Sequence, residues 1–255
     1  TILKTARCPE FKEVEYQKQA ADTLQAYGID SLIVIGGDGS FRGAKDLSDN
    51  CGINVVGIPG TIDNDLAYTD YTLGFDTAVN TVLSAINNLR DTMGSHDRAS
   101  LLEVMGRKCG DIALYASLAG GAEYCITPEV PVDIDEMARS LLQSQKRGKT
   151  SNMIVLAEGA GDRDEICKKI KELTGISVKT TVLGHIQRGG SPTMSDRVLA
   201  ARMAVKAVDL IKENKTNRVI GIKNNAIIDM DISEALAMPR TFDNKLYDIA
   251  HILSL

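Results

Sequence analysis

The sequence of 255 residues is hydrophobic at 44% of its positions, which is enough for the core of one large domain or of two ordinary ones. Its net charge of −5 argues against nucleic acid and anionic membrane surfaces as partners. The five cysteines contain no C-x-x-C pair, as is typical of reduced thiols in a cytosol, and no apolar run approaches the ~20 residues of a membrane helix. We therefore expect a cytoplasmic globular protein.

Short β-branched runs alternate along the chain with longer amphipathic stretches, a pattern typical of β-α units around parallel sheets. In chain order, the pattern predicts helix 14–28, strand 31–35, helix 40–49, strand 53–58, helix 76–92, strand 100–105, helix 111–118, strand 124–127, helix 133–147, strand 152–157, helix 164–173, strand 178–183, helix 195–213 and strand 219–222. So many strands favour an α/β fold of two lobes, each a mostly parallel sheet flanked by helices. We expect the chain to cross between the lobes near residues 71–74 and 184–190.

Ligands of such sheets bind beyond the carboxyl ends of the strands, so the loops after the strands are the candidate sites. The first is residues 36–40 (Gly-Gly-Asp-Gly-Ser), where glycines and a helix N-terminus suit a phosphate and Asp38 suits Mg²⁺. This loop is neither a Walker A motif nor a full G-x-G-x-x-G, because no lysine follows and Arg42 takes the place of the third glycine. The alternative is a tight turn in which Asp38 only caps the helix.

The second loop, residues 59–65, brings Asp63 and Asp65 together with the hydroxyl of Thr61. Phosphoryl transfer to an alcohol needs a base for the hydroxyl proton, and Asp63 is the candidate. On spacing alone, an equally good interpretation makes both aspartates turn residues that satisfy their own backbone.

The third and fourth loops place cations after strands. Residues 105–107 (Met-Gly-Arg) follow strand 100–105, and residues 184–190 contain His185 and Arg188. Arginine makes bidentate contacts to phosphate, so these loops suit a phosphorylated substrate. Taken singly, each cation is better explained as an ordinary surface residue, and only their joint placement favours a site.

These motifs, taken in order, resemble those of the bacterial ATP-dependent 6-phosphofructokinases over essentially the whole chain. The shared segments are residues 5–8, 36–40, 59–65, 103–107, 157–159 and 183–192. The resemblance implies glycolytic transfer of the γ-phosphate of ATP to the 1-hydroxyl of fructose 6-phosphate, with Mg²⁺, giving fructose 1,6-bisphosphate and ADP. It implies a three-layer α/β/α fold whose ATP and Mg²⁺ lobe comprises residues 1–74 and 187–237 and whose fructose 6-phosphate lobe comprises residues 75–186 and 238–255.

The resemblance also implies roles for single residues. Asp63, Arg107 and Thr61 are the implied catalytic residues, with Asp63 as the base, and Asp38 is the implied Mg²⁺ ligand. The implied ATP contacts are Arg7, Cys8, Gly37, Asp38, Gly39 and Ser40. The implied fructose 6-phosphate contacts are Thr61, Asp63, Met105, Gly106, Arg107, Glu158, His185 and Arg188, joined by Arg98 and Lys179 from a neighbouring subunit of a homo-oligomer, usually a tetramer. Lys179 departs from the more usual arginine and cannot make a bidentate contact.

An effector site for ADP or phosphoenolpyruvate is implied at a second subunit interface, at Arg90, Gly121, Glu123, Arg147, Lys149 and Ser151. The alternative is that residues 146–149 form a solvated basic turn. Glycine at positions 39 and 60 favours ATP as the donor, since pyrophosphate-dependent relatives carry aspartate and lysine there. Members of the family carry about two further β-α units before the position of Thr1, so we expect this chain to lack them.

Other functions stay open at this level. One is a non-catalytic or incomplete regulatory subunit that binds a nucleotide or sugar phosphate. NAD kinases and lipid kinases share a GGDG-type loop but lack the run at residues 183–192, and a pyrophosphate-dependent phosphofructokinase is disfavoured by the two glycines.

Overall fold

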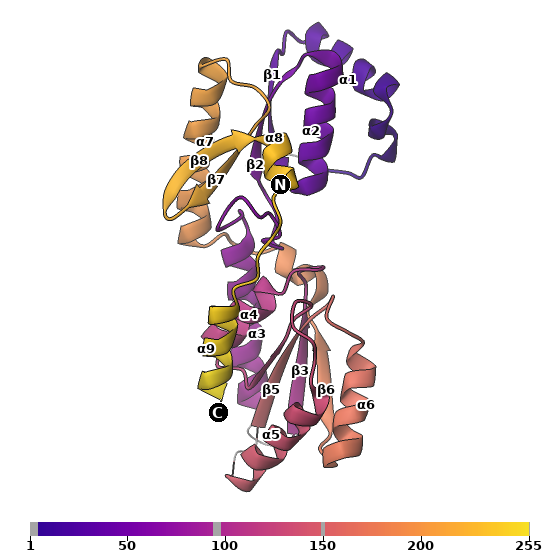
Figure 1. The fold of residues 1–255 in the computed structure, drawn as a ribbon, viewed down its shortest axis with the longest axis vertical. Coiled ribbons are helices and arrows are strands. Elements are labelled where there is room, and N and C mark those ends of the chain that lie inside the picture. The colour runs from indigo at the N-terminus through magenta and orange to yellow at the C-terminus, as the bar shows by residue number, and fades with distance from the viewer. Residues whose placement is uncertain (1–4, 94–97, 149–150, 255) are drawn as a thin grey trace. The chain divides into compact units, whose positions relative to one another are not determined.

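The computed structural model describes residues 5–93, 98–148 and 151–254, and its contacts divide the chain into two compact units. Unit 1 comprises Thr1–Thr61, Leu66–Thr72 and Arg197–Arg240, and unit 2 comprises Ile62–Asp65, Leu73–Asp196 and Thr241–Leu255. Within the described residues, each unit holds a four-stranded sheet with helices packed on it (Figure 1). The predicted α/β class is therefore confirmed.

The sheet of unit 1 has the strand order β1-β2-β7-β8. Its strands are β1 (Ser31–Gly36), β2 (Asn54–Pro59), β7 (Arg218–Lys223) and β8 (Ala226–Asp231), of which the first three are parallel and β8 is antiparallel to β7. Helices α1 (Val14–Ala26) and α2 (Asp38–Cys51) lie on one side of this sheet and α7 (Met194–Lys212) on the other (Figure 1). The 3₁₀-helix η1 (Pro9–Lys12) precedes α1, and α8 (Ile232–Ala237) follows β8.

The sheet of unit 2 is fully parallel in the order β4-β5-β3-β6. Its strands are β3 (Arg98–Val104), β4 (Tyr124–Ile126), β5 (Ser151–Ala157) and β6 (Val178–Val182). The helices of this unit are α3 (Phe75–Met93), α4 (Asp111–Gly120), α5 (Ile134–Lys146), α6 (Arg163–Thr174), the 3₁₀-helix η2 (Gly184–Arg188) and α9 (Asn244–Ser254). No described helix combines the length and the apolarity that crossing a membrane requires.

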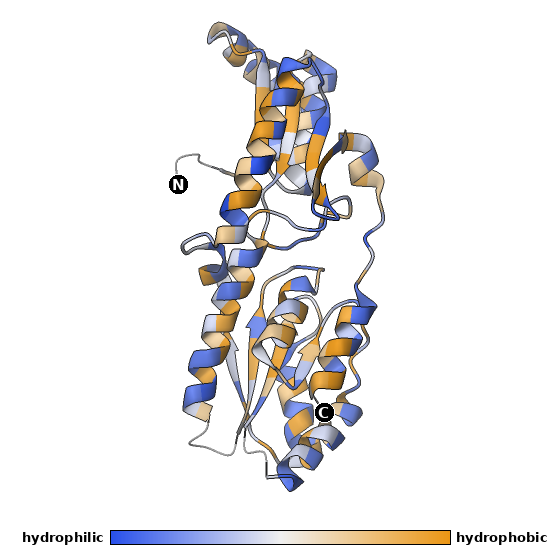
Figure 2. Ribbon diagram, turned by 90° about the vertical axis from the view of Figure 1, so that its left-hand side faces the viewer, coloured by the Kyte–Doolittle hydropathy of each residue, from blue (hydrophilic) through white to orange (hydrophobic). Residues whose placement is uncertain are grey.

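Alternation of side chains along the strands builds the three layers of unit 2, because successive residues of a strand face opposite sides of the sheet. Leu102 and Val104 of β3 pack with α3 and α4, whereas Leu101 packs with Met137 of α5 and Ile166 of α6. Figure 2 shows hydrophobic and hydrophilic residues alternating along the helices, with hydrophobic segments in the strands. The predicted strands 100–105, 124–127, 152–157 and 178–183 thus form the middle layer.

The chain crosses between the units at residues 61–62, 65–66, 72–73 and 240–241. A further crossing, expected at residues 184–190, lies instead between Asp196 and Arg197, at the start of α7. Residues before this point stay with unit 2 because Asp196 accepts hydrogen bonds from the backbone of Gly74 and Thr77, both at 2.9 Å. Buried side-chain contacts, and not the glycine content of the linker, set the boundary.

Some elements carry no counterpart in the predicted series: η1, η2, β8, α8 and α9. The β7–β8 hairpin turns at Asn224 and Asn225, whose φ angles are 48° and 63°. Asparagine tolerates this left-handed conformation, and two such residues in succession are typical of a two-residue hairpin. The sequence therefore did contain a hairpin signal at this point.

Candidate active site

The glycine-rich loop of unit 1 follows directly after the carboxyl end of β1. The strand ends at Gly36, Gly37 is the N-cap of α2, and the helix begins at Asp38. The amide of Gly60 donates to the carbonyl of Gly36 at 2.9 Å, which joins this loop to the one after β2. The first turn of a helix has backbone N–H groups without partners in the helix, so this arrangement suits an anion.

Space within the loop bears on the choice of phosphoryl donor. A Cβ on Gly60 would lie 2.8 Å from Cγ2 of Ile35, so a lysine here requires the Ile35 side chain to move. A Cβ on Gly39 meets nothing within 4 Å. The protein itself therefore resists a side chain at position 60, whereas at position 39 only a bound ligand would exclude one.

Asp38 is the residue of this loop suited to a metal ion. Its carboxylate is half exposed and bonded to Arg42, whose Nε and Nη2 both lie 3.0 Å from its oxygens. A cluster of three or more potential metal ligands occurs nowhere in the described residues. A single carboxylate still fits Mg²⁺, which is commonly held by one or two carboxylates together with water and phosphate oxygens. Arg42 would have to release Asp38.

Arg7 and Cys8 lie on exposed chain just before η1. The thiol of Cys8 donates to Glu10 at 3.5 Å. Both residues belong to unit 1, as does the glycine-rich loop.

The pair Asp63 and Arg107 lies in unit 2. Asp63 is buried, with 4% of its surface exposed, and its Oδ2 is 3.2 Å from Nε of Arg107. Burial raises the pKa of the Asp63 carboxyl, the nearby charge of Asp65 raises it further, and Arg107 opposes the shift. A carboxylate with a raised pKa beside an exposed cation is suited to accept a proton in a reaction that develops negative charge.

Arg107 sits in a tight turn at the end of β3. Its φ is 54° and that of Gly106 is 135°, so two successive residues occupy the region that disfavours side chains. Glu158 holds the turn by accepting a hydrogen bond from the Arg107 amide at 3.0 Å. Gly159 also approaches closely, because a Cβ there would overlap the Arg107 carbonyl.

Gln187 is a residue of the site that the sequence did not single out. It is 1% exposed, accepts a hydrogen bond from the Met105 amide at 3.1 Å, and donates to the Gly184 carbonyl at 3.0 Å. These bonds fasten η2, which carries the exposed side chains of His185 and Arg188, to the end of β3. In the sequence Gln187 lies in a polar loop, where nothing marks it as buried.

Arg98 and Lys179 are not at this end of the sheet. Arg98 begins β3, and Lys179 pairs with Ser100 near the same amino end. At about 3.3 Å per residue, the seven steps from Arg98 to Met105 span roughly 23 Å. The backbone positions of Arg98 and Lys179 are therefore remote from the turn that carries Arg107 within one chain.

The residues expected to bind an effector lie in two places, one around Arg90 and the other between α5 and β5. Arg90 donates to the carbonyl of Gly121 and lies 3.7 Å from the buried carboxylate of Glu123. Arg147 caps α5 and Ser151 begins β5, where it pairs with Arg98. Lys149 lies outside the described residues.

The α/β fold, the glycine-rich loop at a helix N-terminus and the buried carboxylate paired with an arginine are features typical of α/β phosphotransferases. The family model described as phosphofructokinase matches residues 1–211. The chain is 61% identical over 254 residues to proteins named ATP-dependent 6-phosphofructokinase from Clostridium tetani and Clostridium botulinum, covering 100% of this chain and 79% of each relative. This chain belongs to the phosphofructokinase family.

Solved structures agree in fold. The phosphofructokinase of Saccharomyces cerevisiae superposes with a TM-score of 0.86 at 32% identity, over 100% of this chain and 39% of that one. A pyrophosphate-dependent phosphofructokinase from Marinobacter aquaeolei superposes with a TM-score of 0.80 at 21% identity, over 99% of this chain and 73% of that one. The second likeness concerns the fold alone.

Proposed function

We propose that this chain transfers the γ-phosphate of ATP to the 1-hydroxyl of fructose 6-phosphate, giving fructose 1,6-bisphosphate and ADP in glycolysis. The observation that carries the proposal is the buried carboxylate of Asp63 held 3.2 Å from Nε of Arg107. The clostridial relatives named for this reaction, at 61% identity, support it.

In the proposed reaction, Asp63 accepts the proton of the 1-hydroxyl while the hydroxyl oxygen forms a bond to the γ-phosphorus. The bond from that phosphorus to the bridging oxygen breaks, and its electron pair leaves with ADP. Arg107 is largely exposed and has five N–H donors, so it can contact the phosphoryl oxygens while it stays beside Asp63. The hydroxyl of Thr61 provides a further contact.

For ATP, we assign the first turn of α2 and the chain before η1. Gly37, Asp38, Gly39 and Ser40 bring backbone amides to the phosphates, and Arg7 and Cys8 complete the contacts. Asp38 would hold Mg²⁺ after release from Arg42. When bound, Mg²⁺ neutralises charge on the phosphate oxygens.

For fructose 6-phosphate, we assign the turn after β3 together with η2. The contacts within the chain are Met105, Gly106, Arg107, Glu158, His185 and Arg188. Since Arg98 and Lys179 lie at the opposite end of their strands, we assign them to the substrate of a neighbouring subunit, in a cytoplasmic homotetramer. ADP or phosphoenolpyruvate is the proposed effector, at Arg90, Gly121, Glu123, Arg147, Lys149 and Ser151.

The test is an assay of ADP release with MgATP and fructose 6-phosphate, run on the wild-type chain and on Asp63→Asn. We expect turnover in the wild type and a fall of about 10²–10⁴-fold in the variant, the usual contribution of a general base. A thermal shift with fructose 6-phosphate checks that the variant still folds and binds substrate.

Two outcomes would redirect the assignment. Equal turnover with pyrophosphate in place of ATP would contradict the proposed donor. A rise in the Tm of the chain with fructose 6-phosphate or ADP, without any turnover, would favour a non-catalytic subunit. Both measurements use the same protein preparation.

A further inference from the structure

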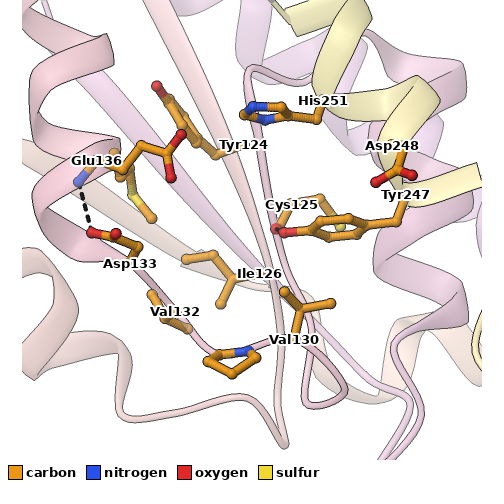
Figure 3. A pocket seen from close by; sticks show the side chains of 12 residues that line it. Tyr124, Cys125, Ile126, Val130, Val132, Asp133, Glu136, Tyr247, Asp248 and His251 are labelled. Atoms are coloured by element: carbon orange, nitrogen blue, oxygen red, sulfur yellow. Dashed lines mark hydrogen bonds between the residues drawn. The ribbon is translucent and has the colours of Figure 1, made fainter. Parts of the chain in front are cut away.

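A cavity of about 220 Å³ opens in unit 2, at the carboxyl end of β4. Figure 3 shows Glu136 reaching toward it from α5, and Tyr247 from α9. The lining residues come from β4, the loop that follows it and these two helices: Tyr124, Cys125, Ile126, Val130, Pro131, Val132, Asp133, Glu136, Met137, Tyr247, Asp248 and His251. None of the residues assigned to the reaction or the effector lines this cavity.

The charge around the cavity is negative. Asp133, Glu136 and Asp248 contribute carboxylates, His251 is the one titratable base, and no described lysine or arginine lines the cavity. Asp133 also caps α5 by accepting a hydrogen bond from the Glu136 amide at 2.8 Å, as Figure 3 shows. An anionic ligand such as a phosphate ester would meet like charge here, whereas a cation would be attracted.

The rest of the lining is aromatic and apolar. The rings of Tyr124 and Tyr247 line the cavity together with the side chains of Ile126, Val132 and Met137. Tyrosine faces attract ammonium and guanidinium groups, and the aliphatic stems that carry such groups pack well on apolar side chains. Ile126 and Met137 are buried and belong to a hydrophobic core cluster of the unit.

Tyr247 is held in place before any ligand arrives. Its hydroxyl donates to the backbone carbonyl of Cys125 at 3.4 Å. Burial is the main cause that raises the pKa of its phenol, with the charges of Glu136 and Asp248 adding to it. Tyr247 and Glu136 line the same cavity from two different helices.

The volume of the cavity and the types of side chain that line it limit which ligand it can hold. The volume lies below the ~300–1,000 Å³ of sites for larger ligands. A metal ion is disfavoured, because the described residues include no cluster of three or more ligands. We infer that this cavity binds a small organic cation, an ammonium or guanidinium group on a short aliphatic stem.

The first test uses n-butylguanidinium, titrated into the full chain by calorimetry, with n-butylurea as the neutral analogue of the same shape and pentanoate as the anionic one. We expect saturable binding of n-butylguanidinium with a dissociation constant on the order of 1 mM, as is ordinary for a ligand of about eight non-hydrogen atoms. The urea and the carboxylate should bind more weakly. Equal binding of either analogue, or no saturable binding of the cation, would overturn the inference.

The second test locates the binding with two variants that each remove one negative charge from the first turn of α5. Glu136→Gln changes a residue of the cavity, whereas Asp135→Asn changes an exposed neighbour that does not line it. We expect the dissociation constant of n-butylguanidinium to rise roughly threefold or more in Glu136→Gln and to stay unchanged in Asp135→Asn. Equal effects would show general attraction to an acidic surface and would contradict a built site. Circular dichroism verifies that both variants fold.

Discussion

Gln187 holds the backbone of Met105 through a hydrogen bond of 3.1 Å between its Oε1 and the Met105 amide. Its Nε2 donates at the same time to Gly184 at 3.0 Å, so one buried side chain ties η2 to the end of β3. The proposed substrate contacts on both segments therefore depend on a residue that has no assigned contact with substrate itself.

Replacing Gln187 with Met, which has a similar length but lacks the strong hydrogen-bonding groups, should loosen this connection. We expect the KM for fructose 6-phosphate to rise roughly 10-fold or more, with a smaller change in kcat, because misplacement by about 1 Å already impairs a site strongly. The free energy of unfolding should fall by about 1–3 kcal/mol, since the Met105 amide is left buried without this acceptor.

Gln143→Met, on the exposed side of α5, is the matched control and should change neither quantity. Steady-state kinetics and urea unfolding measure both effects. A drop in stability with an unchanged KM would mean that Gln187 supports only the fold.

The raised pKa of Asp63 predicts how activity depends on pH. As the base, Asp63 must be ionised, so kcat/KM should fall when the pH drops through its pKa, at a pH above the ~3.9 of an ordinary aspartate. Arg107 lowers this pKa, so in Arg107→Met the residual activity should fall off at a higher pH than in the wild type. A pH–rate profile of each protein measures this, and an acid limb that stays in place would assign the proton acceptor to another group.

The raised pKa of Asp63 also makes the stability of the folded chain depend on pH. Burial in the folded chain disfavours the ionised form of Asp63, so the contribution of Asp63 to stability is greatest below its unfolded pKa of ~3.9 and is lost as the pH rises through its folded pKa. Asp63→Asn removes this penalty. We expect a higher Tm than the wild type at pH 7 and a difference that shrinks as the pH falls toward 4. A lower Tm for the variant at pH 7 would show that the pair with Arg107 outweighs the burial.

Gly106 and Gly43 form a contrasting pair of glycine sites. Gly106 has a φ of 135°, and a Cβ there would overlap the Cys109 carbonyl, so Gly106→Ala should destabilise the chain by about 2 kcal/mol and lower kcat/KM. Gly43 lies within α2, and its added Cβ would make an ordinary 3.5 Å contact with Phe11. Gly43→Ala should therefore stabilise by roughly 0.5–1 kcal/mol without changing activity. Similar unfolding curves for the two variants would contradict the strain at Gly106.

Asp196 caps α3 from a distant part of the chain. It is 6% exposed and accepts hydrogen bonds from Gly74 N and Thr77 N, both at 2.9 Å, and from the Thr77 hydroxyl. Asp196→Ala should lower the free energy of unfolding by about 1–3 kcal/mol, and Asp196→Asn, which keeps one acceptor, by less. Urea unfolding of both variants tests this order, and equal losses would assign the effect to charge instead of hydrogen bonding.

Much of the fold was predictable because it depends on neighbours in the chain. The alternation of strands and helices follows from side-chain periodicity, and the glycine loop lies where a strand meets a helix, as expected. The short, marginally periodic α8 and the C-terminal α9 were missed, as was the β7–β8 hairpin despite Asn224 and Asn225. In these segments burial against other elements, for example of Ile232 and Ala250, contributes more than local pattern.

The sequence by itself determined the α/β class, the order of most elements and the candidate residues Asp38, Asp63 and Arg107, because periodicity, turn chemistry and motif spacing are local properties. Only the tertiary structure decided that Asp63 is buried against Arg107. It also decided that Gln187 reaches Met105 across 82 residues of sequence. Such contacts join segments that are distant in the chain, and they form only when the packing of helices on the sheet brings those segments together.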